Sequence, residues 1–291
     1  MAKTLFSFGH GYTATALSNQ LKASGWRVIG TARTSDRANA LKQAGVEPVL
    51  WPEEVPDFSN VSHLLVSIAP DASGDPVLNE LRDQIELLAP RLQWAGYLST
   101  TAVYGDHAGG WVDENTPLTP ASRRGAQRIE AESAWRQVPN LPIHIFRLAG
   151  IYGPGRGPFA KIRNGNARRI IKPGQVFSRI HVDDIAQVLM ASMANPRPGA
   201  AYNVCDDDPA PPQDVIGLAA ELLDLPLPAE IPFDEAGMTD LARSFYGENK
   251  RVRNDLIKKE LGVKLRYPSY REGLRALLKS EDASRKRQPN V

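Results

Sequence analysis

Short apolar runs alternate with longer segments of helical periodicity along the first half of the chain. The runs predict β-strands at residues 4–8, 26–31, 47–50, 63–68, 94–100 and 143–148. Apolar residues that recur with a helical period predict helices between them, at 14–25, 35–44, 76–88 and 122–137. Such alternation is typical of a parallel sheet with helices on both faces. We therefore predict an α/β fold built on a doubly wound parallel sheet.

The pattern changes after Tyr152, where residues 153–158 form a loop rich in glycine and proline. Beyond it the periodicity predicts helices at 183–194, 213–223, 238–245, 254–261 and 270–278, a strand at 201–204 and an irregular stretch at 224–232. The polar residues 281–291 are expected to form a flexible tail. The second half of the chain thus lacks the regular alternation of strands and helices that marks the first half.

The turn between the first predicted strand and the first predicted helix reads FGHGYTA at residues 8–14. Gly9 permits a tight turn, Gly11 leaves room for a pyrophosphate against the backbone, and Ala14 lets the helix pack closely on the strand. Free N–H groups at the helix start would face the anion. A tight turn without a ligand is the alternative, but the strand-to-helix context favours a dinucleotide site.

Composition narrows the class of protein. A chain of 291 residues with 42% hydrophobic and 23% charged residues is expected to form one large or two modest soluble domains. The net charge of +2 implies no nucleic-acid partner. Apolar runs too short for a membrane span, histidines without metal-ligand spacing and a single cysteine, Cys205, indicate a cytoplasmic protein with no metal site.

Several further motifs are similar to those of one family. They are LSTTAVYG at 98–105, DENTPLTP at 113–120, FRLAGIYGPGR at 146–156, FSRIHVDDIA at 177–186, YNVCDDDP at 202–209 and RVRNDLIKKELG at 251–262. With the glycine turn, their order resembles an extended, atypical short-chain dehydrogenase/reductase of the NAD(P)-dependent epimerase/dehydratase family.

The resemblance implies a fold and a division into domains. We expect a Rossmann-type dinucleotide-binding domain from residues 1–152 plus about 175–204. A smaller C-terminal α/β substrate domain would comprise residues 153–174 and 205–280. A homodimer through the helix at 122–137 is a further implication of the resemblance.

The sequence departs from the family at the catalytic pair. The family carries a Tyr-x-x-x-Lys pair on the helix after Pro120, and alignment on Gly125 places Arg124 and Arg128 at these positions. A guanidinium stays protonated and cannot shuttle a proton as a tyrosine does. The family's Ser or Thr partner is present as Thr100. Arg124 and Arg128 could clamp an anion, or Arg128 could simply pair with Glu132 on the helix surface.

NADP is the expected cofactor, with NAD as the alternative. No acidic residue follows the second predicted strand before Asp36, whereas Arg33 is placed to bind a 2′-phosphate and Arg37 could add charge. The resemblance and the glycine turn together assign cofactor contacts to Gly9, Gly11, Tyr12, Ala14, Arg33, Ser67, Ile68 and Ala69.

The resemblance also assigns residues to the substrate cleft, namely Tyr104, Tyr152 and Arg179. Aromatic packing is the alternative role for both tyrosines, and His181 is expected to make a structural hydrogen bond at a loop–helix junction. The sequence therefore supports an oxidoreductase or epimerase acting on a small polar or sugar-like molecule. A non-catalytic NADP-binding sensor is the alternative, because the catalytic pair is replaced.

Overall fold

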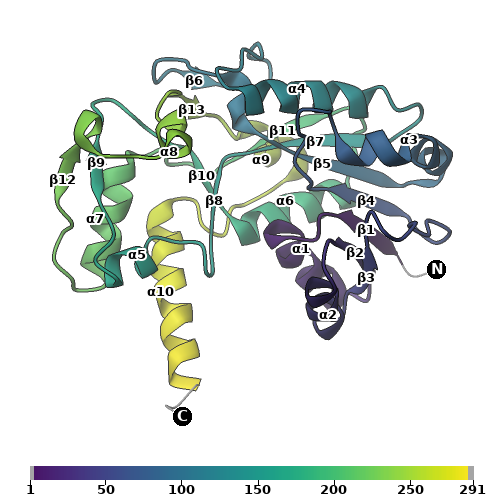
Figure 1. The fold of residues 1–291 in the computed structure, drawn as a ribbon, viewed down its shortest axis with the longest axis horizontal. Helices are drawn as coiled ribbons and strands as arrows, with labels where there is room; N and C mark the ends of the chain where they lie inside the picture. Colours follow the sequence, from purple (N-terminus) through teal and green to yellow (C-terminus); the bar gives the residue numbers. More distant parts are fainter. Residues whose placement is uncertain (1–2, 288–291) are drawn as a thin grey trace.

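A seven-stranded parallel sheet forms the centre of the molecule (Figure 1). The computed structural model describes residues 3–287. The strand order β11-β7-β5-β4-β1-β2-β3 places the first strand near the middle. The strands are β1 (Thr4–Phe8), β2 (Arg27–Ala32), β3 (Glu47–Leu50), β4 (His63–Val66), β5 (Trp94–Thr100), β7 (Ile143–Leu148) and β11 (Ala201–Val204). All neighbouring pairs are parallel, which confirms the predicted doubly wound, Rossmann-type sheet.

Helices cover both faces of this sheet (Figure 1). One hydrophobic core joins the sheet to α1 (Tyr12–Ala23), α2 (Ser35–Gln43) and α6 (Val182–Ala194). The core of the other face contains residues of α3 (Pro76–Leu88) and α4 (Arg123–Arg136). Apolar burial on both faces explains why β1 and β4 are largely apolar along their length instead of alternating.

Helix starts are fixed by side-chain caps that the sequence supplies. The Ser122 hydroxyl accepts a hydrogen bond from the Gly125 N–H at 3.2 Å and sets the start of α4. The Asp75 carboxylate does the same for α3, accepting from Val77 and Leu78. Each cap satisfies N–H groups that a helix cannot pair internally, so these boundaries match the predicted ones closely.

A second, smaller core lies beside the sheet. It joins Tyr152 to residues of α5 (Phe159–Arg163), α7 (Pro212–Leu222) and α10 (Tyr270–Arg287). A two-stranded parallel sheet of β9 (Arg169–Ile171) and β12 (Glu230–Pro232) packs there, so part of the stretch predicted as irregular forms a strand. The last helix continues past residue 278 to Arg287, into the segment expected to be a tail. Residues 288–291 lie outside the described residues.

One short strand pairing connects the two cores, and a second one belongs to the larger core. Strand β8 (Gly150–Tyr152) pairs with β10 (Arg179–His181), and β6 (Trp111–Val112) pairs with β13 (Arg251–Val252). The helix α9 (Asp255–Leu261) packs against the large sheet, with Ile257 and Leu261 in its core. The C-terminal segment thus contributes to both cores and returns to the carboxyl ends of the central strands.

Candidate active site

One cavity of about 1170 Å³ opens along the carboxyl ends of the central strands. It begins at Gly9 and Gly11 after β1, passes Ser67 and Ala69 after β4, and reaches Thr100 at the end of β5. From there it extends to the second core, where residues of α5, α7 and the short helix α8 (Asp240–Phe245) line it. Parallel α/β sheets bind ligands at this edge.

The fold itself requires a glycine at position 9, whether or not a ligand binds. Its backbone has φ +74°, and a Cβ at this position would lie 2.7 Å from Ile68 Cγ1. The Ser67 hydroxyl donates to the Gly9 carbonyl, and the Gly9 N–H donates to Thr31 Oγ1 at 2.8 Å. Ser67 and Ile68 therefore shape the turn, and Ser67 also lies on the cavity wall together with Ala69.

Gly11 faces open space. A Cβ there would meet only the Gly9 carbonyl, at 3.7 Å, so the protein leaves a cradle that a side chain would fill. Gly11 caps α1 without a side chain, the first turn of α1 carries no acidic residue, and Ala14 is buried beneath it. The unpaired N–H groups of a helix start suit a phosphate, so this turn fits the pyrophosphate of a dinucleotide.

Tyr12 connects the glycine turn to the loop at 153–158. Its phenol donates to the Pro154 carbonyl at 3.0 Å, and the Arg156 guanidinium lies 5.7 Å from its ring centroid. Burial raises the pKa of Tyr12 above its ordinary value. Tyr12 therefore holds one edge of the cavity together and stays protonated.

The two basic residues after β2 lie differently. Arg33 is exposed and is not part of the cavity wall. Arg37, also exposed, donates from Nη2 to the His10 carbonyl at 2.9 Å, directly at the glycine turn. His10 is buried, and this burial, with the nearby Arg37 and Lys22 charges, lowers its pKa to about 4. At neutral pH the positive charge beside the turn therefore comes from arginine and not from His10.

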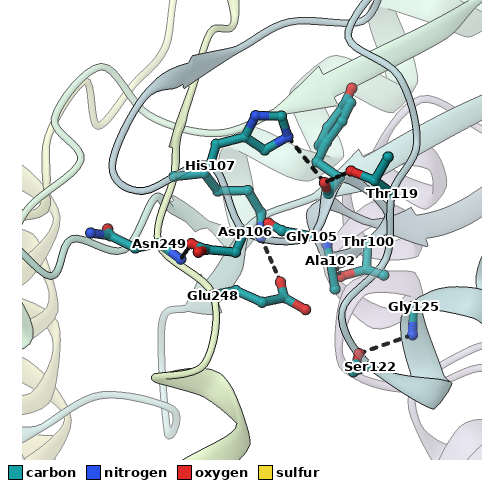
Figure 2. Close-up of polar contacts among 12 residues, drawn as sticks. Thr100, Ala102, Gly105, Asp106, His107, Thr119, Ser122, Gly125, Glu248 and Asn249 are labelled. Atoms are coloured by element: carbon teal, nitrogen blue, oxygen red, sulfur yellow. Dashed lines mark hydrogen bonds and ion pairs between the residues drawn. The ribbon is translucent and has the colours of Figure 1, made fainter.

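Thr100 stands at the junction between the two parts of the cavity. It caps the short 3₁₀-helix η2 (Thr101–Tyr104), and its hydroxyl oxygen accepts from the Ala102 N–H at 3.2 Å (Figure 2). The hydroxyl proton is still available for a group in the cavity. The end of β5 thus holds the Thr100 hydroxyl at the place where the resemblance expects a Ser or Thr.

Arg128 is held against the sheet. Its Nη1 donates to the Tyr97 hydroxyl at 3.0 Å and to the Leu98 carbonyl at 2.8 Å. The alternative of a surface pair with Glu132 does not form, because Glu132 is buried and binds Arg147 at 2.9 Å. Arg128 therefore presents a fixed positive charge on the cavity wall.

Arg124 reaches across the cavity. It lies on the first turn of α4 and is exposed, and its guanidinium is 5.5 Å from the ring centroid of Phe245 in α8. This cation–π contact joins the two sides of the cavity mouth. Both arginines line the cavity, at the positions where the resemblance expects tyrosine and lysine.

Tyr104 lies in the protein interior, although it was expected in the substrate cleft. Its hydroxyl donates to Asn203 Oδ1 at 2.7 Å and accepts from Arg147 Nη1 at 3.0 Å. Arg147 completes the network by binding Glu132, and burial raises the pKa of Tyr104. The aromatic-packing alternative describes Tyr104 better than a substrate contact does.

Tyr152 and Arg179 both lie on the cavity wall. The Tyr152 phenol donates to the Ser269 carbonyl at 3.4 Å, and burial raises its pKa well above the ordinary value. Arg179 Nη1 donates to the carbonyls of Phe177 and Ala210 at 2.7 and 3.0 Å. Behind them, His181 Nδ1 accepts from the Asp183 N–H at 3.2 Å, the structural hydrogen bond expected at this junction.

Glu248 and Lys250 are cavity residues that sequence reasoning missed. They form an ion pair of 2.5 Å, and their side chains are only 12% and 10% exposed. The stretch from 246 to 250 has no apolar periodicity to mark it, and the nearest recognised motif begins at Arg251. The one signal that the sequence offers for these residues is a pair of opposite charges two positions apart.

Comparison with known proteins identifies the family. The sequence profile of the NAD dependent epimerase/dehydratase family matches residues 91–205. Protein YeeZ of Escherichia coli K12 is 31% identical over 212 residues, which cover 68% of this chain and 75% of YeeZ. The chain belongs to the NAD-dependent epimerase/dehydratase family.

Solved structures of this family's fold superpose on nearly the whole chain. A protein of unknown function from Silicibacter pomeroyi is 64% identical, with a TM-score of 0.93 over 97% of this chain and 100% of that one. The human epimerase family protein SDR39U1, solved with NADPH, is 17% identical, with a TM-score of 0.75 over 95% and 99%. The human protein supports the fold alone.

Among residues 3–287, no helix is long and apolar enough to cross a membrane, and no cluster of His, Cys, Asp and Glu could hold a metal ion. Cys205 is fully buried, its thiol donates to the Val252 carbonyl, and burial raises its pKa.

Proposed function

We propose that this chain is an NADP-linked oxidoreductase that acts on a small, polar, sugar-like molecule carrying an acidic group. One observation carries the proposal: a single cavity joins the phosphate cradle at Gly11 to Thr100 and then to the second core. A dinucleotide held at the cradle would supply hydride chemistry when bound. The remaining length of the cavity offers a place for a second molecule.

The charges of the wall favour an anionic partner. Seven of its charged side chains are basic and one is acidic: Arg124, Arg128, Arg156, Lys161, Arg168, Arg179 and Lys250 against Glu248. The dinucleotide phosphates at the glycine turn would neutralise only part of this charge. Phosphate or carboxylate on the substrate would neutralise more, and arginine forks match both groups.

NADP is the preferred dinucleotide in this proposal. The end of β2 carries Arg33 where NAD-specific proteins place an acid, and Arg37 already points to the glycine turn. The human protein of the same fold was solved with NADPH, so a fold of this kind can hold a nicotinamide dinucleotide.

The wall offers no ready proton donor of the family's kind. Arg124 and Arg128 stay charged, and burial raises the pKa of each wall tyrosine within the described residues: Tyr12, Tyr152 and Tyr246. In the proposed reaction Thr100 positions the reacting oxygen and the arginines stabilise negative charge on it. The proton then comes from water in the open cavity.

The same observation favours a second candidate function. A chain that holds NADP in the cradle and lacks a proton relay would serve as a redox sensor, with α8 and Arg124 responding to the bound dinucleotide. The two functions differ in turnover and agree in cofactor binding. For either function we propose a cytoplasmic location and a homodimer that forms through α4.

Calorimetric titration tests the cofactor. We expect NADPH to bind more tightly than NADH, and Arg33→Ala to reduce that preference by about 1.5–3 kcal/mol, the size of a lost charge-assisted hydrogen bond. Lys42→Ala, an exposed residue at the far end of α2, is the matched control. Equal or tighter binding of NADH would refute the NADP assignment.

NADPH oxidation across a panel of phosphorylated and carboxylated aldehydes and ketones separates enzyme from sensor. Turnover that Arg124→Ala reduces identifies the reductase. NADPH binding without turnover on any member identifies the sensor. Turnover on neutral substrates that is unaffected by Arg124→Ala would contradict the anionic-substrate assignment.

A further inference from the structure

Residues 248–252, here called the strap, run along the cavity wall and line it with every second residue. Glu248, Lys250 and Val252 line the cavity, whereas Asn249 and Arg251 do not. Alternation of this kind belongs to extended backbone, in which successive side chains point to opposite sides. The strap therefore has a cavity side and an anchoring side.

The anchoring side binds the protein. Asn249 Oδ1 accepts from the Val176 N–H at 3.1 Å, and Asn249 Nδ2 donates to the Gly174 carbonyl at 3.0 Å. The Asn249 N–H donates to Asp106 Oδ1 at 2.7 Å (Figure 2), and Arg251 donates to the Gly109 carbonyl. These bonds hold the backbone of the strap from its anchoring side.

The cavity side carries the buried ion pair. Lys250 Nζ donates to Glu248 Oε2 at 2.5 Å and to the Gly105 carbonyl at 2.7 Å. Gly105 ends the same η2 turn that Thr100 begins, so the pair lies at the far end of that turn from Thr100. An ammonium has three N–H groups and a carboxylate two oxygens, so one donor and one acceptor remain for a ligand.

We propose that Glu248 and Lys250 form a hydroxyl-binding subsite for the substrate, an inference that rests on the proposed function. The pair is neutral overall, and a hydroxyl can accept from Lys250 while donating to Glu248. A second anion would gain Lys250 but would be repelled by Glu248. The arginines therefore select the acidic group of the substrate, and the strap selects a hydroxyl group at a distance from it.

A matched pair of probes tests the subsite. sn-Glycerol 3-phosphate carries a phosphate and two hydroxyls, and propyl phosphate has a similar length without hydroxyls. We expect the wild-type chain, with or without saturating NADPH, to bind the glycerol ester roughly tenfold more tightly, as for a hydroxyl bonded to charged groups. NMR titration gives both dissociation constants.

Two variants locate that difference at the strap. Glu248→Gln and Lys250→Met should reduce the discrimination between the probes to about twofold or less and leave propyl phosphate affinity within about twofold, because its phosphate uses the arginines. Glu248→Gln keeps the size of the side chain, so it serves if Lys250→Met fails to fold. Lys259→Met, at an exposed position of α9 away from the cavity wall, should retain the discrimination.

The results separate this inference from the proposed function. Equal affinity of the wild-type chain for the two probes, or no detectable binding of either, would overturn the subsite. Discrimination that survives Glu248→Gln would also overturn it. Failure to bind NADPH would instead refute the proposed function and leave the probe comparison standing.

Discussion

Gly9 and Gly11 are glycines for different physical reasons, although only His10 separates them. Gly9 has a positive φ and no room for a Cβ beside Ile68. Gly11 has an ordinary φ of −96° and open space above it. The backbone conformation and the close packing explain the first glycine, and a ligand that needs the space explains the second.

Substitution by alanine should separate these two roles. Gly9→Ala should lower the free energy of unfolding by about 1–3 kcal/mol, through its φ and the Ile68 contact. Gly11→Ala should change it by less than about 0.5 kcal/mol while weakening dinucleotide binding severalfold. Urea unfolding and calorimetric NADPH titration measure the two effects, and wild-type affinity in Gly11→Ala would place the phosphate site elsewhere.

Residues in contiguous motifs could be placed from the sequence, and residues fixed by distant partners could not. Gly9, Gly11 and Thr100 follow strands that the apolar pattern reveals, so their position at the sheet edge could be predicted. Tyr104 also follows a strand, but its inward turn depends on Arg147 and Asn203, far along the chain.

At the scale of elements, the length of a strand or helix decided whether it could be predicted from the sequence. The long strands and capped helices of the large sheet carry enough apolar periodicity to be recognised. The two- and three-residue strands β6, β8, β9, β10, β12 and β13 carry almost none, and they exist because their partners lie beside them. The strap belongs to this second group, and so its cavity residues were missed.

A buried ion pair binds α4 to the sheet in addition to its apolar contacts. Glu132 accepts from Arg147 Nη2 at 2.9 Å and from the Ser99 hydroxyl at 2.5 Å, which joins α4 to β7 and β5. Both charged side chains are almost fully buried. Such a pair costs desolvation when it forms, but losing one partner leaves the other charge buried and unpaired.

Glu132→Ala should therefore lower the free energy of unfolding by about 3–5 kcal/mol. Glu130→Ala, an exposed residue on the same helix, should change it by less than about 0.5 kcal/mol. Denaturant unfolding of both variants measures the difference. Equal effects of the two substitutions would show that the pair does not hold α4 in place.

For the whole molecule, buried titratable groups set how stability depends on pH. Burial lowers the pKa of His10 and His63 to about 4, and burial raises the pKa of Asp206 to about 8. The histidines must charge on unfolding when the pH falls below their ordinary pKa. Asp206 must lose its proton on unfolding when the pH lies between its ordinary pKa and its raised one.

These shifts act in opposite directions. The stability that the neutral histidines supply is present above about pH 6.5 and is lost as the pH falls through 4. The stability that protonated Asp206 supplies is present below about pH 4 and is lost as the pH rises through 8. The two ranges overlap, and two histidines there oppose one carboxyl, so these three groups together favour a maximum of stability near pH 6.5.

Asp206→Asn should remove the alkaline part of this dependence. Its free energy of unfolding relative to the wild-type chain should rise with pH by up to about 1.4 kcal/mol per unit between about pH 5 and 8. Urea unfolding at several pH values measures the slope, with the exposed Asp83→Asn as a control that should stay flat. A flat difference for Asp206→Asn would mean that Asp206 is already ionised in the folded protein, balanced by the nearby Arg179. The cavity wall at Arg179 would then be less positive than the anionic-substrate proposal assumes.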